Sequence, residues 1–299
     1  MSRAATGLVG ALEIGGTHVS AARVNVARSV LASELRRASL DGRGSRDELL
    51  AKITTAAVDI SMSEIDLWGV ATPGPFDYAR GVSQIRGLGK LDDLYGVDLR
   101  GRLARDLGLA APERVLFLND AHAFVLGEWW AGAAKGHARA MGVTLGTGLG
   151  SGFLAGGRLV VSGPEIPPDA RLDLVRFRGG PVEDVISSRG IVAAFGETID
   201  VAEIARRARE GDAAALAVFR EFGSAFGEFV GPWIARFEPT CLVFGGSITR
   251  AWDLFSGGFR DACPEAARLD RCGPADRLDE APLLGAALHA VRGQSETTS

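Results

Sequence analysis

Residues 8–24 read LVGALEIGGTHVSAARV and residues 141–161 read MGVTLGTGLGSGFLAGGRLVV, so one pattern occurs twice in the chain. In each stretch a short apolar run enters a glycine-rich turn, and a second apolar run leaves it. This pattern predicts a tight β-hairpin whose bare backbone can come close to a ligand. Because one hairpin lies near the start of each half, the repeat indicates a duplicated fold.

The two turns also have the composition of an anion site. Gly15-Gly16-Thr17 and Gly146-Thr147-Gly148 can each present successive backbone N–H groups to phosphate oxygens. For either turn alone, a plain chain reversal remains the alternative, because glycine is the default residue of tight turns. Taken together, the two turns favour a nucleotide gripped between two lobes.

Composition places the chain among ordinary globular proteins. Of its 299 residues 46% are hydrophobic and 23% are charged, which allows one or two domains with a substantial core. The net charge of −4, without a long basic run, argues against nucleic acid as a partner. No stretch of about 18 apolar residues and no leader pattern occurs, so we expect no membrane partner and a cytoplasmic location.

The three cysteines, Cys241, Cys263 and Cys272, are too few and too scattered for a disulfide framework. They are not paired with histidines at metal-ligand spacing either, which fits a reduced compartment.

Strands alternate with helices along the chain, which indicates an α/β architecture. We expect an N-terminal small lobe over residues 1–118 and a C-terminal large lobe over 119–282, with a final helix over 283–292 crossing back to the first lobe. The remaining predicted strands cover 19–25, 30–35, 67–71, 115–118 and 241–244, and the predicted helices cover 47–61, 98–107, 121–130, 201–209, 213–237 and 282–291.

Asp120 is the strongest candidate for catalysis. It follows the apolar strand predicted over 115–118, so its carboxylate would stand at a strand end facing a cleft. Phosphoryl transfer needs positioning, charge stabilisation and a group that accepts the hydroxyl proton, and a carboxylate there suits the last role. The alternative is that Asp120 caps the following helix, since Asp is a favoured N-cap residue.

Several short motifs occur in a fixed order along residues 8–291. They resemble those of the ROK family (repressor, open reading frame, kinase) of sugar kinases and sugar-responsive regulators. The resemblance implies an α/β, two-lobed actin-like or hexokinase-like ATPase fold with duplicated ribonuclease H-like domains. The motifs are Glu13-Ile14-Gly15-Gly16-Thr17, Pro73-Gly74-Pro75, Asn119-Asp120 with Gly127-Glu128, Gly146-Thr147-Gly148-Leu149-Gly150 and Gly245-Gly246-Ser247.

The resemblance also implies roles for individual residues. It makes Asp120 the catalytic base and assigns the sugar to Asn119, Asp120, Glu165, Glu183, Gly74 and Lys90. It assigns the nucleotide and its phosphates to Glu13, Gly15, Gly16, Thr17, Gly146, Thr147, Gly148, Gly246 and Ser247. For Glu165 and Glu183 the alternative is a pair of solvated loop acids, and for Glu13 an exposed acid at a strand end.

The sequence departs from the family pattern at several positions. Glu13 stands where the family usually has Asp, and Lys90 stands near where it often has a sugar-binding Asn. Residues 164–183 contain no cysteine and no histidine, so we expect no structural zinc, and Pro168 replaces a histidine that touches sugar in many members. These differences make an unusual hexose credible.

The resemblance therefore implies ATP-dependent phosphorylation of a hexose or modified hexose, at C6, by a homodimer that binds Mg²⁺ with the nucleotide. Glucose is the family default, and an amino-sugar kinase of the kanosamine type or a catalytically inactive sugar sensor are the alternatives. A DNA-binding regulator is not expected, since only twelve residues precede Glu13.

Overall fold

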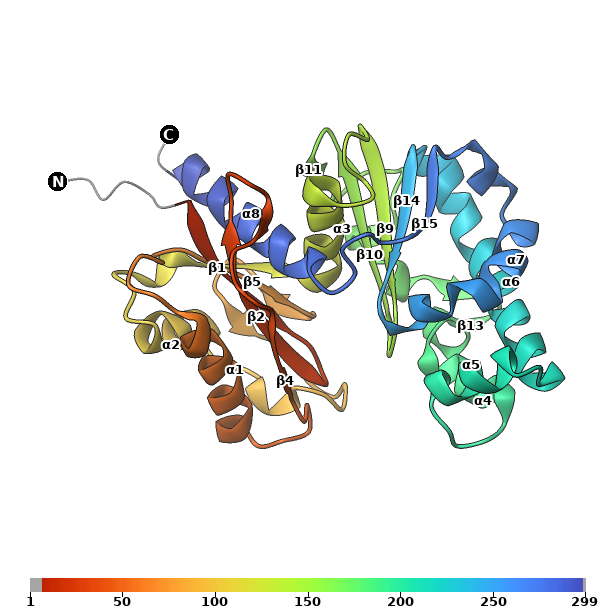
Figure 1. Ribbon diagram of the computed structural model, residues 1–299, viewed down its shortest axis with the longest axis horizontal. Coiled ribbons are helices and arrows are strands. Elements are labelled where there is room, and N and C mark those ends of the chain that lie inside the picture. The colour runs from red at the N-terminus through yellow and green to blue at the C-terminus, as the bar shows by residue number, and fades with distance from the viewer. Residues whose placement is uncertain (1–6, 298–299) are drawn as a thin grey trace. The chain divides into compact units, whose positions relative to one another are not determined.

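The computed structural model describes residues 7–297, which divide into two compact units (Figure 1). The first unit contains residues 7–131 together with 279–297, and the second contains 132–278. Each unit is built on its own β-sheet with helices packed against it.

The sheet of the first unit grows from the predicted N-terminal hairpin. β1 (Leu8–Ile14) pairs antiparallel with β2 (His18–Asn25) and parallel with β5 (Trp68–Thr72), which pairs parallel with β8 (Val115–Asn119). The strand order is β3-β2-β1-β5-β8, with β4 also paired to β2.

The prediction of a single strand over 30–35 is wrong. Only Val30–Leu31 forms a strand in that range (β3), and a separate strand, β4 (Arg36–Ser39), begins after it. Between them the Ser33 hydroxyl accepts the backbone N–H of Arg23 at 3.0 Å. This side-chain bond replaces a ladder bond, so the regular pairing with β2 is interrupted there.

Alternating side chains of β1 bury on opposite faces of the sheet, as the pleat requires. Leu12 and Ile14 pack in the core under α1 (Arg46–Ile60), while Val9 and Ala11 pack in the core under α8 (Ala281–Thr297). The chain begins α1 with a capping box, in which the Glu48 carboxylate accepts the N–H of Ser45 at 2.9 Å.

α3 (Asp120–Ala131) lies against α8 at close range. A Cβ added to Gly127 would stand 2.0 Å from the carbonyl oxygen of Ala281, so only glycine fits that crossing. Because of this packing, α3 belongs to the first unit, and the division falls after Ala131 rather than at the predicted residue 118.

The second unit repeats the arrangement of strands. β9 (Arg139–Leu145) and β10 (Leu149–Ala155) form the second predicted hairpin, and β14 (Cys241–Gly245) lies parallel to β9. The order is β11-β10-β9-β14-β15, so both sheets continue from an antiparallel hairpin into parallel strands. The predicted duplicated α/β fold is confirmed.

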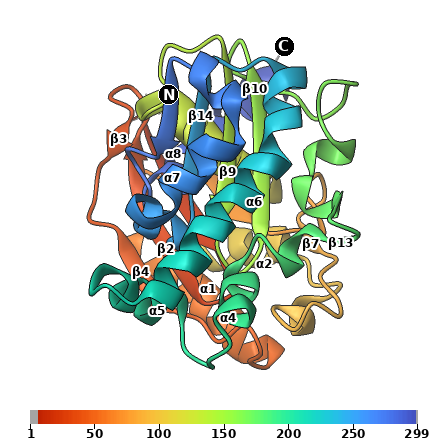
Figure 2. The ribbon, with the colours of Figure 1, turned by 90° about the vertical axis from the view of Figure 1, so that its right-hand side faces the viewer.

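α5 (Val201–Arg209) and α6 (Ala213–Phe237) have the predicted bounds. Figure 2 shows α6 and α7 (Trp252–Ala262) in front of the sheet of the second unit, and aromatic contacts explain this. Phe226 of α6 and Phe259 of α7 both meet Phe244 of β14, at centroid distances of 5.3 and 5.4 Å. The sequence did not predict α7.

The remaining elements are short. The helices are α2 (Leu99–Asp106) and α4 (Ser188–Phe195), and the strands are β6 (Phe76–Asp77), β7 (Val82–Ser83), β11 (Arg158–Leu159), β12 (Arg176–Phe177), β13 (Gly180–Pro181) and β15 (Arg271–Pro274). Single 3₁₀ turns cover Asp92–Leu94, Pro112–Arg114, Pro168–Ala170, Leu172–Leu174, Val182–Asp184, Ser247–Ala251 and Pro264–Arg268. Within residues 7–297, no helix combines the length and the apolar character needed to cross a bilayer.

Candidate functional site

Polar side chains gather at the carboxyl ends of the parallel strands in the first unit. Glu13 of β1 pairs in register with Ala71 of β5, and Thr72 of β5 pairs with Asn119 of β8. The sheet therefore places Glu13, the turn Gly15–Thr17, Asn119 and Asp120 along one edge. In open α/β sheets this edge is where ligands bind.

The turn Gly15–Thr17 is tied to the rest of the unit through its backbone. Gly15 donates its N–H to the carbonyl of His18 at 2.9 Å, which closes the turn. His18 Nε2 also lies 3.7 Å from the Glu13 carboxylate, whose side chain is 19% exposed. The site thus combines a rigid glycine turn with a carboxylate that a ligand can still reach.

Asp120 is the first residue of α3 and is half-buried. Burial raises the pKa of its carboxyl, the negative charge of Glu13 raises it further, and the positive charge of Lys90 acts in the opposite direction. A carboxylate with a raised pKa is a stronger base, which is the property that proton acceptance requires. Asp120, Glu13 and Lys90 thus form one electrostatic group.

Asn119 provides much of the N-terminal capping of α3. Helix capping was the alternative role predicted for Asp120. Its Oδ1 accepts the N–H groups of Ala121 and His122, at 3.1 and 3.2 Å, although Asp120 Oδ1 also accepts from Ala121 at 2.9 Å. The Asn119 amide in turn donates to the Tyr78 hydroxyl at 3.2 Å. The capping bonds hold the start of α3 and fix the direction in which Asp120 points.

Tyr78 lies beside the candidate site residue Asn119, and it was not among the residues predicted from the sequence. Its hydroxyl donates to the carbonyl of Thr72 at 3.2 Å, and it would stand 3.4 Å from a Cβ on Gly74. The predicted Pro-Gly-Pro segment is therefore brought beside Asn119. Only the position of Tyr78 shortly after that segment could have signalled its role.

In the second unit, the turn Gly146–Gly150 is fixed from two sides. Gly146 donates its N–H to Gly148 O at 3.0 Å, and its own carbonyl accepts the N–H and the hydroxyl of Ser188, at 2.8 and 3.0 Å. Thr147 at the tip is exposed. The start of α4, which the sequence did not predict, thus supports this turn.

The Glu183 side chain reaches the same glycine turn from the 3₁₀ turn Val182–Asp184. Its Oε1 accepts the N–H of Leu149 at 2.8 Å, and a Cβ on Gly148 would stand 2.5 Å from that oxygen. Glu165, by contrast, lies on its own loop, with its carboxylate 2.7 Å from a Cβ placed on Gly163. Of the two predicted sugar-binding glutamates, the structure therefore brings Glu183 to the predicted phosphate turn.

The predicted turn Gly245-Gly246-Ser247 lies next to the turn Gly146–Gly150. Gly246 has a positive φ of 83°, and a Cβ there would stand 2.2 Å from the carbonyl oxygen of Leu145, so the turn requires glycine. Ser247 Oγ lies 3.7 Å from a Cβ placed on Gly146. The two turns of the second unit that the sequence predicted to bind the nucleotide are therefore neighbours.

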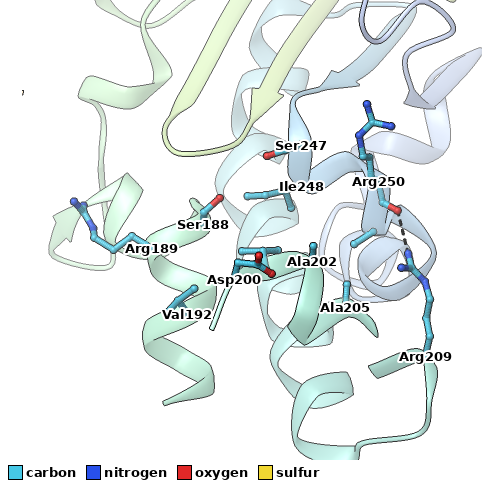
Figure 3. Close-up of a pocket in the computed structure, with 12 residues that line it drawn as sticks. Ser188, Arg189, Val192, Asp200, Ala202, Ala205, Arg209, Ser247, Ile248 and Arg250 are labelled. Atoms are coloured by element: carbon cyan, nitrogen blue, oxygen red, sulfur yellow. Dashed lines mark hydrogen bonds between the residues drawn. The ribbon is translucent and has the colours of Figure 1, made fainter. Parts of the chain in front are cut away.

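A cavity of about 570 Å³ opens beside these motifs (Figure 3). Ser188 and Ser247 belong both to its wall and to the surroundings of the turn, and Arg209 donates to the carbonyl of Arg250 at 3.0 Å along one side. Of the residues that line the cavity, only Ser247 was predicted from the sequence to bind a ligand. The lining residues are Ser188, Arg189, Val192, Asp200, Val201, Ala202, Ala205, Arg209, Ser247, Ile248, Arg250 and Ala251. A lining of small apolar side chains with a few polar groups is typical of ligand sites.

The loop over 164–183 is organised by hydrogen bonds and apolar burial. The buried Ser151 hydroxyl donates to Ala170 O at 2.6 Å and accepts the N–H of Leu172 at 3.1 Å. Ala170 and Leu172 are themselves fully buried in the core of the second unit. Across the described part of the chain, no cluster of three or more His, Cys, Asp or Glu side chains has an arrangement that could hold a metal ion.

The comparisons with known proteins agree with this architecture. The family model described as "ROK family" matches residues 9–166 and 177–292. The chain is similar to the glucokinase of Thermotoga maritima, with 27% identity over 92% of this chain and 95% of that protein. It is also similar to an N-acetyl-D-glucosamine kinase of Pectobacterium atrosepticum, with 29% identity over 64% of this chain and 69% of that protein.

Solved structures show the same fold. A ROK family glucokinase from Streptomyces griseus, in complex with glucose and AMPPNP, superposes with a TM-score of 0.76 at 22% identity, covering 96% of this chain and all of that one. A ROK hexokinase from Thermus thermophilus gives a TM-score of 0.74 at 23% identity, covering 97% and 99% of the two chains. The predicted hexokinase-like fold is therefore confirmed, and this chain belongs to the ROK family.

Proposed function

We propose that this chain is a sugar kinase that transfers the γ-phosphoryl group of ATP to a hydroxyl of a hexose or modified hexose, at C6. The observation that carries the proposal is the placement of Asp120 at the carboxyl end of β8, in one electrostatic group with Glu13 and beside the turn Gly15–Thr17. A base and an anion-binding turn on one sheet edge are what phosphoryl transfer to a hydroxyl needs.

In the proposed step, the sugar hydroxyl oxygen forms a bond to the γ-phosphorus while the bond from that phosphorus to the bridging oxygen breaks. The electron pair of the broken bond leaves with ADP, and the hydroxyl proton passes to the Asp120 carboxylate. The capping bonds of Asn119 hold the start of α3, so Asp120 meets the hydroxyl in a fixed direction.

The nucleotide is proposed to bind the second unit. The turns Gly146–Gly148 and Gly246-Ser247 are neighbours, and Ser247 also lines the cavity, so phosphates on the turns and a nucleoside in the cavity would be continuous. The apolar side chains of Val192, Ala205 and Ile248 line this cavity and suit a flat heterocyclic base.

Magnesium arrives with the nucleotide phosphates and keeps most of its water. Glu13 fits a role toward that ion, because its carboxylate is partly exposed next to the phosphate turn and can bind metal-held water. Bound there, the ion would neutralise phosphate charge during transfer.

The sugar is proposed to contact Asn119, Asp120, Gly74, Glu165 and Glu183. Support for a hexose comes from the relatives, which are named as kinases of glucose and of N-acetylglucosamine. The proposal also includes the cytoplasmic location and the homodimer that the family resemblance implies.

The test is ADP formation from Mg-ATP across a panel of hexoses, free amino sugars and N-acetylated amino sugars. Sugar-dependent turnover with one of them would support the proposal and would identify the substrate, including the amino-sugar alternative. Saturable sugar binding without turnover for any sugar would contradict it and would support an inactive sensor.

A further inference from the structure

Three segments of the first unit are joined by backbone hydrogen bonds beside the phosphate turn. Gly42 donates its N–H to the carbonyl of Gly16 at 3.1 Å, and Leu91 donates its N–H to the carbonyl of Gly42 at 2.5 Å. The turn Gly15–Thr17 and the loop that carries Lys90 are thus fixed to each other through Gly42.

The Lys90 loop is itself rigidly built. The Asp92 carboxylate accepts the N–H groups of Leu88 and Gly89, at 3.0 and 2.9 Å. Leu91 is fully buried although its φ is +60°, a conformation that a leucine adopts only where packing holds it. These contacts fix the position of the Lys90 backbone and therefore the direction in which its side chain leaves the loop.

The Lys90 side chain runs along the phosphate turn. A Cβ placed on Gly16 would lie 3.0 Å from its Cδ and 3.6 Å from its Cβ, so the aliphatic chain covers the bare backbone of that glycine. Its positive charge also acts on Asp120, where it lowers the pKa of the carboxyl. Among the described residues Lys90 forms no ion pair within 4.0 Å, which leaves its ammonium group available to a ligand.

We propose that the Lys90 ammonium group binds the oxygens of the transferring phosphoryl group, as a catalytic residue of the sugar kinase reaction. This inference rests on the proposed function. In that reaction the phosphoryl group passes from the turn Gly15–Thr17 toward the hydroxyl held by Asp120. Lys90 is the cation whose side chain runs along this turn and whose charge reaches this base.

The chemistry favours phosphate over sugar as the partner of Lys90. Neutral sugar hydroxyls both donate and accept hydrogen bonds, so they are met by carboxylates, which accept, and by amides, which accept and donate. An ammonium group only donates and carries a positive charge, so it matches an anion. Charge develops on the phosphoryl oxygens during transfer. A fixed cation beside them therefore stabilises the transition state more than it stabilises the complex with bound sugar before transfer. The sequence-based assignment of Lys90 to the sugar is thereby replaced by one to the phosphoryl group.

The test compares Lys90→Met, Lys90→Arg and the exposed-helix control Lys52→Met by steady-state kinetics with the sugar that the wild type accepts. We expect Lys90→Met to lower kcat by about 100-fold, in line with the loss of one group that stabilises transition-state charge, with little change in the KM for sugar. Lys90→Arg should recover much of kcat, because it keeps the charge. Lys52→Met should match the wild type.

A second measurement does not depend on turnover. Mg-ADP, fluoroaluminate and sugar together mimic the transferring group, and they should raise the melting temperature of the wild type more than that of Lys90→Met. An unchanged kcat, or a raised sugar KM at constant kcat, would overturn the assignment of Lys90 to the phosphoryl group. Absence of turnover in the wild type would instead refute the proposed function itself.

Discussion

Oε1 of Glu183 accepts the backbone N–H of Leu149 at 2.8 Å, inside the glycine-rich turn between β9 and β10. A carboxylate therefore already occupies one donor of a turn that is proposed to hold phosphate. The hydroxyl of Ser187 donates to the carbonyl of Glu183 at 2.6 Å, which fixes the glutamate backbone as well. Glu183 thus shapes the turn in addition to any contact that it makes with sugar.

Replacing Glu183 should separate these two roles. Without sugar present, Glu183→Ala should weaken ADP binding by about tenfold, because the Leu149 N–H loses a charged acceptor worth roughly 1.5–3 kcal/mol. Glu183→Gln keeps an acceptor and should bind ADP like the wild type. Calorimetric titration would check this, with Asp261→Ala, an exposed acid of α7 outside the cavity, as control. Equal ADP affinity in Glu183→Ala and the wild type would exclude a role in shaping the turn.

The activity should depend on pH through Asp120. Because burial raises the pKa of this carboxyl, the acidic limb of kcat/KM should lie above the ordinary aspartate value of 3.8. Lys90→Met removes the opposing positive charge, so the limb should move to still higher pH, while Lys90→Arg should leave it in place. A pH–rate profile of the three proteins checks this, and a limb that stays fixed in Lys90→Met would argue against the electrostatic coupling.

Stability should depend on pH through His122. Burial lowers the pKa of His122 from 6.5 to about 4, with the nearby charge of His289 adding to the effect. As pH falls from 6.5 toward about 4, His122 therefore binds a proton in the unfolded chain but not in the folded chain. The contribution of neutral His122 to the free energy of unfolding is full above pH 6.5 and is lost on acidification. Between about pH 7 and about pH 5 the loss is about 2 kcal/mol.

Urea unfolding at those two pH values checks this contribution. His122→Gln cannot titrate, so its free energy of unfolding should fall less on acidification than that of the wild type, by about the same 2 kcal/mol. The same pH dependence in both proteins would show that His122 does not remain neutral in the fold.

The cavity of the second unit offers a test of nucleotide binding. Ala202 lines it and is exposed, so Ala202→Phe fills space without disturbing the core. We expect a several-fold rise in the KM for ATP with an unchanged KM for sugar. Ala214→Phe, on an exposed position of α6 outside the cavity, is the matched control, and equal ATP KM values for both variants would place the nucleoside elsewhere.

The sequence predicted those parts of the fold whose signals are local. α5 and α6 begin after Asp200 and Asp212, whose side chains cap them, and both predicted ranges match the structure. The two glycine turns were recognisable because their composition differs from that of the strands on either side. Their pairing into hairpins followed from the short turn length alone.

What the sequence could not predict depends on contacts between distant segments. The Tyr78 hydroxyl meets Asn119 only because β5 and β8 are neighbours in the sheet, and no sequence pattern states that neighbourhood. The cavity is likewise formed by the consecutive helices α4 and α5 together with the turn after β14, which lies far from both along the chain. α7 was missed because its aromatic face packs on Phe244, a partner that sequence periodicity does not reveal.

Transfer of a labelled γ-phosphoryl group from Mg-ATP to sugar, by the wild type and by Asp120→Asn, tests the central claim most directly. The asparagine keeps an oxygen that can accept the Ala121 N–H, so the fold should persist, and unchanged ADP affinity would confirm that it does. The account predicts label on the sugar with the wild type and a loss of about 100-fold or more with Asp120→Asn. Equal transfer rates for the two proteins would contradict it.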